Sequence, residues 1–209
     1  MKRKIYLIYL LCIILLGGCK EDEYVYPSVL TELVDIRSNS SGRLSEIISD
    51  NGNVYTINER NGLEGFVPDS IYRTLSIFEP DSYSNATLYS CQLVLSMKPE
   101  KPEYFKDGMK TDPLDIQRIW QSGKYINMVL VIQGKDKPHG FHFMEEGIDN
   151  NILTLTLYHD QNNDYKAFGK EVYISIPLWQ YEDVLDDKSQ IKININTFKE
   201  GMTSRIFNL

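Results

Sequence analysis

Short β-forming segments separated by turn residues run along almost the whole chain, and this spacing constrains the fold more than any other feature. About five such segments fall between residues 28 and 97, and about seven more follow in the last 100 residues. Asp50-Asn51-Gly52-Asn53 contains the Asn-Gly pair that tight hairpins favour. Tyr125 to Ile132 is almost continuously apolar, which is typical of a central strand. The pattern predicts an almost all-β protein.

Two prolines among six mostly polar residues, Lys98-Pro99-Glu100-Lys101-Pro102-Glu103, mark the best boundary between two domains. Proline cannot donate to a sheet, and this composition suits a stiff linker. The five strands before it predict a small OB-like barrel at 28–98, followed by a linker at 99–110. The strands after it predict a β-sandwich at 111–209. Leu178 to Leu185, after Pro177, suits one short helix.

The first nineteen residues have the layout of a bacterial lipoprotein signal. Lys2, Arg3 and Lys4 are basic, and the apolar run from Ile5 to Leu16 is shorter than the roughly 20 residues of a membrane-spanning helix. Leu16-Gly17-Gly18-Cys19 then resembles a lipobox. We therefore predict a cleaved signal peptide at 1–18, acylation of Cys19 and a lipidated tether at 19–27.

The residues directly after the predicted lipidation site indicate where in the cell envelope the protein is located. Lys20, Glu21 and Asp22 resemble the signal that exports Bacteroidetes lipoproteins to the outer face of the outer membrane. The alternative is a plain charged tether that keeps the lipid away from the folded body. We predict an outer-membrane protein, anchored through lipid on Cys19 and facing the extracellular side.

Charge and cysteine content exclude several classes of protein. After cleavage, 19 Lys and Arg stand against 29 Asp and Glu, a formal net charge of −10. Basic residues form no cluster, so this surface repels phosphate backbones and nucleic acid is not an expected partner. Cys12 would leave with the signal peptide and Cys19 would carry the lipid, so Cys91 has no disulfide partner. It shares one face of a strand with Leu93 and Leu95, which predicts a buried, inert thiol.

The layout of the second half resembles a known family. Four stretches carry the resemblance: Asp112 to Ile116, Trp120 to Asn127, Leu155 to Asp164, and Ile191 to Ile195. Together with the lipobox and the acidic tether, they look like the NigD-like lipoproteins of Bacteroidetes. The resemblance covers nearly the whole mature chain and implies an N-terminal OB-like domain and a C-terminal β-sandwich domain. That family has no agreed catalytic residues, so the resemblance transfers only Cys19 as a site.

Histidines and one oxygen-rich loop are the candidates for a metal site. His139 and His142 are three residues apart, and on a strand that spacing directs them to opposite faces, which disfavours a shared zinc ion. His159 follows at a loop edge. Asp160 to Asp164 resembles a calcium loop but lacks the glycine at the sixth place, and a polar hairpin tip explains it equally well. We expect no cofactor, and weak calcium binding remains the alternative for this loop.

The chain contains no nucleophile elbow, phosphate loop, Cys-His pair or dinucleotide fingerprint. Asp69-Ser70-Ile71 resembles an O-glycosylation acceptor, a short motif that leaves modification of Ser70 open. Tyrosines suit sugar or peptide surfaces, although sheets favour tyrosine in any case. Seven lie in or near the predicted barrel: Tyr24, Tyr26, Tyr55, Tyr72, Tyr83, Tyr89 and Tyr104.

These observations predict a non-enzymatic envelope lipoprotein that acts as an interaction or binding module for a glycan, a peptide or a neighbouring envelope protein. Two alternatives stay open. One is a hydrolase of surface polymers, which needs two carboxylates held together in a pocket. The other is a purely structural lipoprotein.

Overall fold

The computed structural model describes residues 28–61, 67–81 and 83–209. The predicted signal peptide, Cys19 and the export residues Lys20, Glu21 and Asp22 lie outside the described residues. The described part contains thirteen strands and two short 3-10 turns, which confirms the all-β prediction. Over these same residues, no helix has the length and hydropathy needed to cross a membrane.

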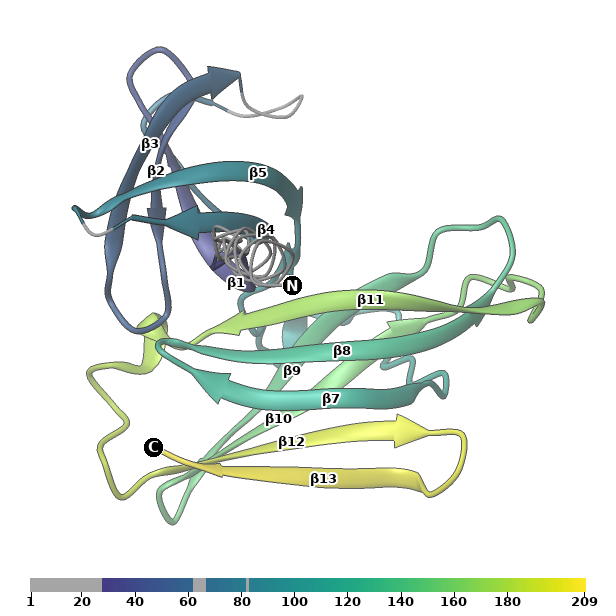
Figure 1. The fold of residues 1–209 in the computed structure, drawn as a ribbon. Coiled ribbons are helices and arrows are strands. Elements are labelled where there is room, and N and C mark those ends of the chain that lie inside the picture. Colours follow the sequence, from purple (N-terminus) through teal and green to yellow (C-terminus); the bar gives the residue numbers. More distant parts are fainter. Residues whose placement is uncertain (1–27, 62–66, 82) are drawn as a thin grey trace, which may run out of the picture.

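The first five strands form a closed barrel (Figure 1), in the order β1-β2-β3-β5-β4. Four of the pairings are antiparallel, whereas β3 and β5 close the barrel in parallel through only two residue pairs. Gly52, at φ 88°, lies in the predicted β2–β3 turn, where a side chain would be strained. The strands are β1 (Leu30–Ser38), β2 (Arg43–Ile48), β3 (Val54–Asn61), β4 (Ile71–Pro80) and β5 (Asn85–Leu93).

The remaining strands form a sandwich of two four-stranded sheets, and the barrel stands over one end of it (Figure 1). The β8 sheet consists of β6 (Leu95–Ser96), β11 (Phe168–Pro177), β8 (Tyr125–Gly134) and β7 (Asp115–Ser122), in that order. The β10 sheet consists of β13 (Gly201–Asn208), β12 (Gln190–Thr197), β10 (Ile152–Asp160) and β9 (Gly140–Asp149). The five-stranded barrel and the sandwich are therefore confirmed.

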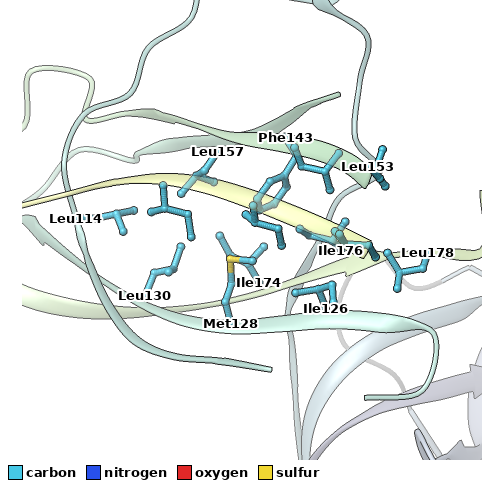
Figure 2. Packing of buried hydrophobic residues seen from close by; sticks show 14 of the residues in the cluster. Leu114, Ile126, Met128, Leu130, Phe143, Leu153, Leu157, Ile174, Ile176 and Leu178 are labelled. Atoms are coloured by element: carbon cyan, nitrogen blue, oxygen red, sulfur yellow. The ribbon is translucent and has the colours of Figure 1, made fainter. Parts of the chain in front are cut away.

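The main core lies between the two sheets (Figure 2). Ile126, Met128 and Leu130 of β8 point inward with period two and meet Phe143 and Leu153 of the β10 sheet. The alternate residues of β8 are also largely buried, because the barrel covers part of the outer face. The continuous apolar run that predicted a central strand is explained by this burial on two faces.

One local prediction is confirmed in part and another is wrong. Over 178–185 the structure has a short 3-10 helix, η2 (Trp179–Tyr181), followed by a turn in which the Leu185 N–H donates to the Tyr181 carbonyl at 2.9 Å. On β5, Cys91 is half-buried against the barrel core, but Leu93 and Leu95 are 46% and 44% exposed. β5 ends at Leu93, and Leu95 belongs to β6, which pairs with β11 of the sandwich, so the three residues do not lie on one buried face of a single strand. Burial nevertheless raises the pKa of the Cys91 thiol, as an inert cysteine requires.

The segment assigned to the linker lies against the sandwich. Glu100 forms a bridge with Met144 of β9, and η1 (Pro102–Tyr104) follows. Just before this segment, β6 pairs with β11 of the β8 sheet. The segment that connects the two units therefore already pairs with strands of the sandwich.

Candidate binding groove between the barrel and the sandwich

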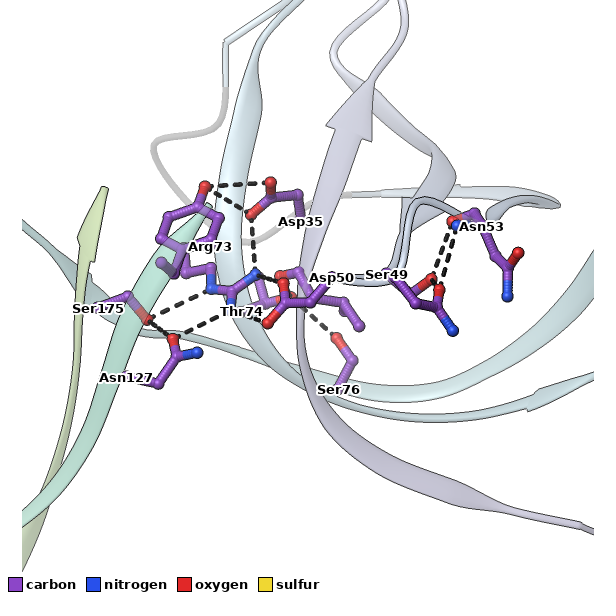
Figure 3. Close-up of polar contacts among 12 residues, drawn as sticks. Asp35, Ser49, Asp50, Asn53, Arg73, Thr74, Ser76, Asn127 and Ser175 are labelled. Atoms are coloured by element: carbon purple, nitrogen blue, oxygen red, sulfur yellow. Dashed lines mark hydrogen bonds and ion pairs between the residues drawn. The ribbon is translucent and has the colours of Figure 1, made fainter. Parts of the chain in front are cut away.

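A buried arginine fastens the barrel to the sandwich (Figure 3). The side chain of Arg73, on β4, is 1% exposed and donates to both carboxylate oxygens of Asp50 at 2.6 and 2.8 Å. From the β8 sheet, Asn127 Oδ1 accepts from Arg73 Nη2 at 3.0 Å, and Ser175 Oγ lies 3.3 Å from Nε. Asn127 and Ser175 are directly paired across β8 and β11, so the sheet presents them to the guanidinium together. We call this cluster, with Asp35 and Tyr125, the Arg73 clamp.

Asp35 and Tyr125 complete the clamp from either side of the domain boundary. The Tyr125 hydroxyl donates to the Asp35 carboxylate at 3.0 and 3.1 Å, and the Arg73 guanidinium lies 3.8 Å from the centre of the Tyr125 ring. Burial raises the pKa of Asp35, although Arg73 opposes the shift, and burial also raises the pKa of Tyr125. The clamp joins the two units through charge-assisted hydrogen bonds.

A groove of about 730 Å³ runs beside the clamp, between the barrel and the outer face of the β8 sheet. Its floor includes Trp120 of β7, Val129 of β8 and Tyr173 of β11. The barrel and the edge of β7 provide the other lining residues: Thr31, Glu32, Leu33, Ser49, Asp50, Asn51, Leu75, Gln117, Arg118 and Ser122. The volume lies within the range of pockets that hold small ligands or side chains.

A β-bulge shapes the rim of the groove. Ile116 pairs with Leu130 and Arg118 pairs with Val129, so Gln117 is an extra residue in β7. Both Gln117 and Arg118 are exposed as a result. The Arg118 guanidinium lies 4.3 Å from the centre of the Trp120 ring and covers one face of the indole. Bulges are common where a strand must redirect a side chain at a binding site.

Two carboxylates lie close together next to the groove, as the hydrolase alternative requires, but both already form hydrogen bonds within the protein. Asp50 directs both oxygens to Arg73, and Asp35 bonds to Arg73 and Tyr125. Both carboxylates thus serve the contact between the domains. This geometry favours a structural role for the pair over general acid and base catalysis.

The three histidines do not gather in one place. His139 Nδ1 and His159 Nε2 share a hydrogen bond of 2.9 Å, and His159 Nδ1 donates to the Asp112 carbonyl at 2.7 Å. His142 instead contacts Tyr104, whose hydroxyl lies 3.2 Å from its Nε2. Burial lowers the pKa of His159. Among the described residues, no three His, Cys, Asp or Glu side chains lie together in a way that could hold a metal ion.

The oxygen-rich loop has the geometry of a turn. Asn162 and Asn163 adopt φ of 53° and 52°, the left-handed conformation that asparagine tolerates. Asp160 pairs with Lys110 at 2.7 Å. Burial raises the pKa of Asp164, but backbone N–H groups, first that of Lys135, hold it well below the usual range. The Asp160 and Asp164 carboxylates of this loop thus accept hydrogen bonds from other groups of the protein.

Those of the singled-out tyrosines that the structure describes, and Ser70, are not among the residues that line the groove. Tyr83 is 82% exposed in the β4–β5 turn, and Tyr89 bonds to Glu79 on the barrel. Ser70 is half-buried, and its hydroxyl donates to the Pro68 carbonyl at 3.1 Å. Tyr24 and Tyr26 lie outside the described residues.

Sequence reasoning missed the residues that form the groove, because Trp120 and Tyr173 come from strands far apart in the chain. One local signal was available. The three-residue spacing from Ile116 to Ile119 breaks the alternation of β7 and marks the bulge that exposes Gln117 and Arg118.

Comparisons with known proteins agree with this architecture. Residues 96–209 match the family model of the NigD-like C-terminal beta sandwich domain. The chain is similar to the crystal structure of a NigD-like immunity protein from Bacteroides caccae, with TM-score 0.68 and 29% identity over 88% of this chain and 94% of that one. No curated protein matches the chain.

More distant structures share the fold. A candidate toxin-related protein from Parabacteroides distasonis has TM-score 0.70 and 15% identity, over 87% of this chain and 93% of that one. A candidate lipoprotein from Bacteroides fragilis has TM-score 0.59 and 11% identity, over 87% and 97%. Because the family model spans more than half of the 209 residues and carries the sandwich described above, the chain belongs to the NigD-like family.

Proposed function

We propose that this protein is a non-catalytic, lipid-anchored envelope lipoprotein that binds a partner in the groove between its two domains. The observation that carries the proposal is the groove itself, which has an aromatic floor and polar walls from both domains. The Arg73 clamp holds the walls in place before a partner arrives. A preformed site avoids part of the ordering cost of binding.

The ion pairs that Asp35 and Asp50 form with Arg73 favour a binding role over a catalytic one. Asp35 and Asp50 both bond to Arg73, so a hydrolase would have to release them from the clamp. The similar protein from Bacteroides caccae is named an immunity protein, which also fits recognition of another molecule. Replacing Asp50 should therefore lower stability at pH 7, whereas loss of a specific polymer-cleaving activity in Asp35 or Asp50 variants would support the hydrolase alternative.

The anchor brings the groove close to a membrane. Cys19 lies nine residues before Ser28, a reach of about 30 Å when extended. Thr31, Glu32 and Leu33, which follow directly, line the groove. We propose attachment to the outer membrane through Cys19, with Lys20, Glu21 and Asp22 directing the protein to the extracellular face. The similar fold of a candidate lipoprotein fits this location.

Site-specific photo-crosslinking in intact cells tests the binding site. A photoreactive residue replaces exposed Gln117 at the groove rim, and a control replaces Ile206, which is 58% exposed on β13. We expect a discrete crosslinked partner from position 117 only. Equal crosslinking from both positions, or none from position 117, would reject the groove as the binding site.

Lipidation and orientation need separate measurements. Cys19→Ala should move the protein to the soluble fraction. Protease treatment of intact cells should cleave the wild-type protein, and Glu21→Ala with Asp22→Ala should protect it. Protection of the wild type would reject surface exposure and leave lipidation standing.

A further inference from the structure

We propose that the groove takes an extended polypeptide segment, with an acidic side chain of the segment at Arg118 and a basic side chain at Glu32. The inference rests on the proposed function, because it names the occupant of the same groove. Its basis is the charge, the aromatic chemistry and the dimensions of the groove.

The groove carries two opposite charges that the protein does not neutralise. Arg118 comes from β7 of the sandwich and Glu32 from β1 of the barrel, and both are exposed. Within the described ranges, neither forms an ion pair, whereas Asp50 beside them is balanced by Arg73. A ligand with both an anionic and a cationic group complements this arrangement. A polypeptide supplies both, whereas a neutral glycan supplies neither.

The aromatic floor also favours a polypeptide. One face of Trp120 lies under the Arg118 guanidinium, so that face is closed to a stacking sugar ring. The Tyr173 hydroxyl donates to Glu171 at 3.0 Å, and Val129 lies between the two aromatic residues. Trp, Tyr and Arg are the residue types that contribute most binding energy at the centres of protein interfaces. All three occur together in this groove.

The register of the strands defines the length of segment that fits. Val129 of β8 pairs with Tyr173 on one side and with Arg118 on the other, and Trp120 lies two residues beyond Arg118. Two strand spacings and two residues along a strand separate Trp120 from Tyr173 by about 10–12 Å. Three to four extended residues cover that distance at about 3.3 Å each. The two rings can therefore anchor side chains of one short segment.

Peptide selection with charge-swap variants tests the proposal. A display library of random peptides is selected on the full mature chain with Cys19→Ser, and on the Arg118→Glu, Glu32→Lys and doubly swapped forms. Wild type should select an acidic and a basic residue at a fixed spacing. Each single swap should weaken the selected peptides at least tenfold, and the double swap should select the reversed charge order.

Matched controls separate the groove from overall charge. Lys199→Glu and Glu200→Lys change exposed residues within the β12–β13 turn, so they should leave the selected peptides and their affinities unchanged. Because all four substituted residues are exposed, circular dichroism and melting temperature should match wild type in every variant.

The inference would be overturned by selected peptides that lack the charge pair, or by a charge pair that survives the swaps at Arg118 and Glu32. A glycan array that shows binding lost in Trp120→Ala, with no peptide selected, would also overturn it. That last result would leave the groove as the binding site, whereas absence of crosslinking from position 117 would reject the proposed function itself.

Discussion

The sandwich and the barrel achieve stability in different ways. Among the residues that the structure describes, sixteen buried ones fill the sandwich between its two facing sheets, whereas eight fill the barrel. The barrel interior also contains Thr74 and Ser76, whose hydroxyls bond to each other at 2.9 Å. On its outside, Arg73 is buried only because the sandwich supplies Asn127 and Ser175. The comparison indicates a self-sufficient sandwich and a barrel that depends on docking.

Truncating one core residue in each unit gives the largest expected effect. Phe143→Ala in the sandwich and Phe78→Ala in the barrel each remove a fully buried ring, at a cost of about 3–5 kcal/mol. Trp120 and Trp179 report on the sandwich by fluorescence, and labelling of Cys91 reports on the barrel.

In urea, Phe143→Ala should shift both signals together, because the barrel docks on the sandwich. Phe78→Ala should shift Cys91 labelling to lower urea and leave most of the Trp transition in place. If Phe78→Ala moves both signals equally, the two units unfold as one and the proposed dependence is wrong.

Breaking the clamp tests the docking directly. Arg73→Met leaves Asp35 and Asp50 partly buried without their cation, which should cost about 3–5 kcal/mol. The control Arg37→Met removes an exposed pair with Glu46 and should cost about 0–1 kcal/mol. Cys91 labelling under native conditions should accelerate only in Arg73→Met, and equal rates in the two variants would argue against the clamp.

The two acids of the clamp should respond differently to amidation. Asp50→Asn weakens two short hydrogen bonds to Arg73 and should cost about 1.5–3 kcal/mol at pH 7. The pKa of Asp35 is raised by burial above its ordinary value of 3.8, so the native state favours its protonated form relative to the unfolded state. Its contribution is therefore largest at low pH and is lost as pH rises through the native pKa.

Asp35→Asn removes that pH dependence and should be nearly neutral at pH 7. Unfolding free energies of wild type and both variants between pH 3 and 7 measure the effect. A wild-type curve that gains stability relative to Asp35→Asn as pH rises would reverse the assigned sign.

The smallest expected effect concerns His159 in the sandwich. Burial lowers its pKa below the ordinary 6.5, so its contribution to stability is present above that value and is lost as pH falls. In His159→Asn, the loss of stability between pH 7.5 and pH 5 should be smaller than in wild type, and an unchanged loss would show that His159 is not responsible.

Local features of the sequence were sufficient for the strands. The Asn51-Gly52 pair placed the β2–β3 hairpin, because a tight turn needs residues that accept positive φ. The continuous apolar run from Tyr125 to Ile132 marked β8 as central, because both of its faces are covered. Alternation was a poor guide at Cys91 and Leu93, because β5 ends at Leu93 and the chain leaves the barrel for β6 of the sandwich.

The sequence by itself determined the all-β class, the turn positions and the likeness to the NigD-like family, since these depend on neighbouring residues and short motifs. Only the tertiary structure decided that Arg73 meets Asn127 and Ser175, that His139 pairs with His159, and that Arg118 and Glu32 line one groove. The physical reason is that periodicity shows which residues share a face of a strand. It does not show which distant strand or domain will pack against that face.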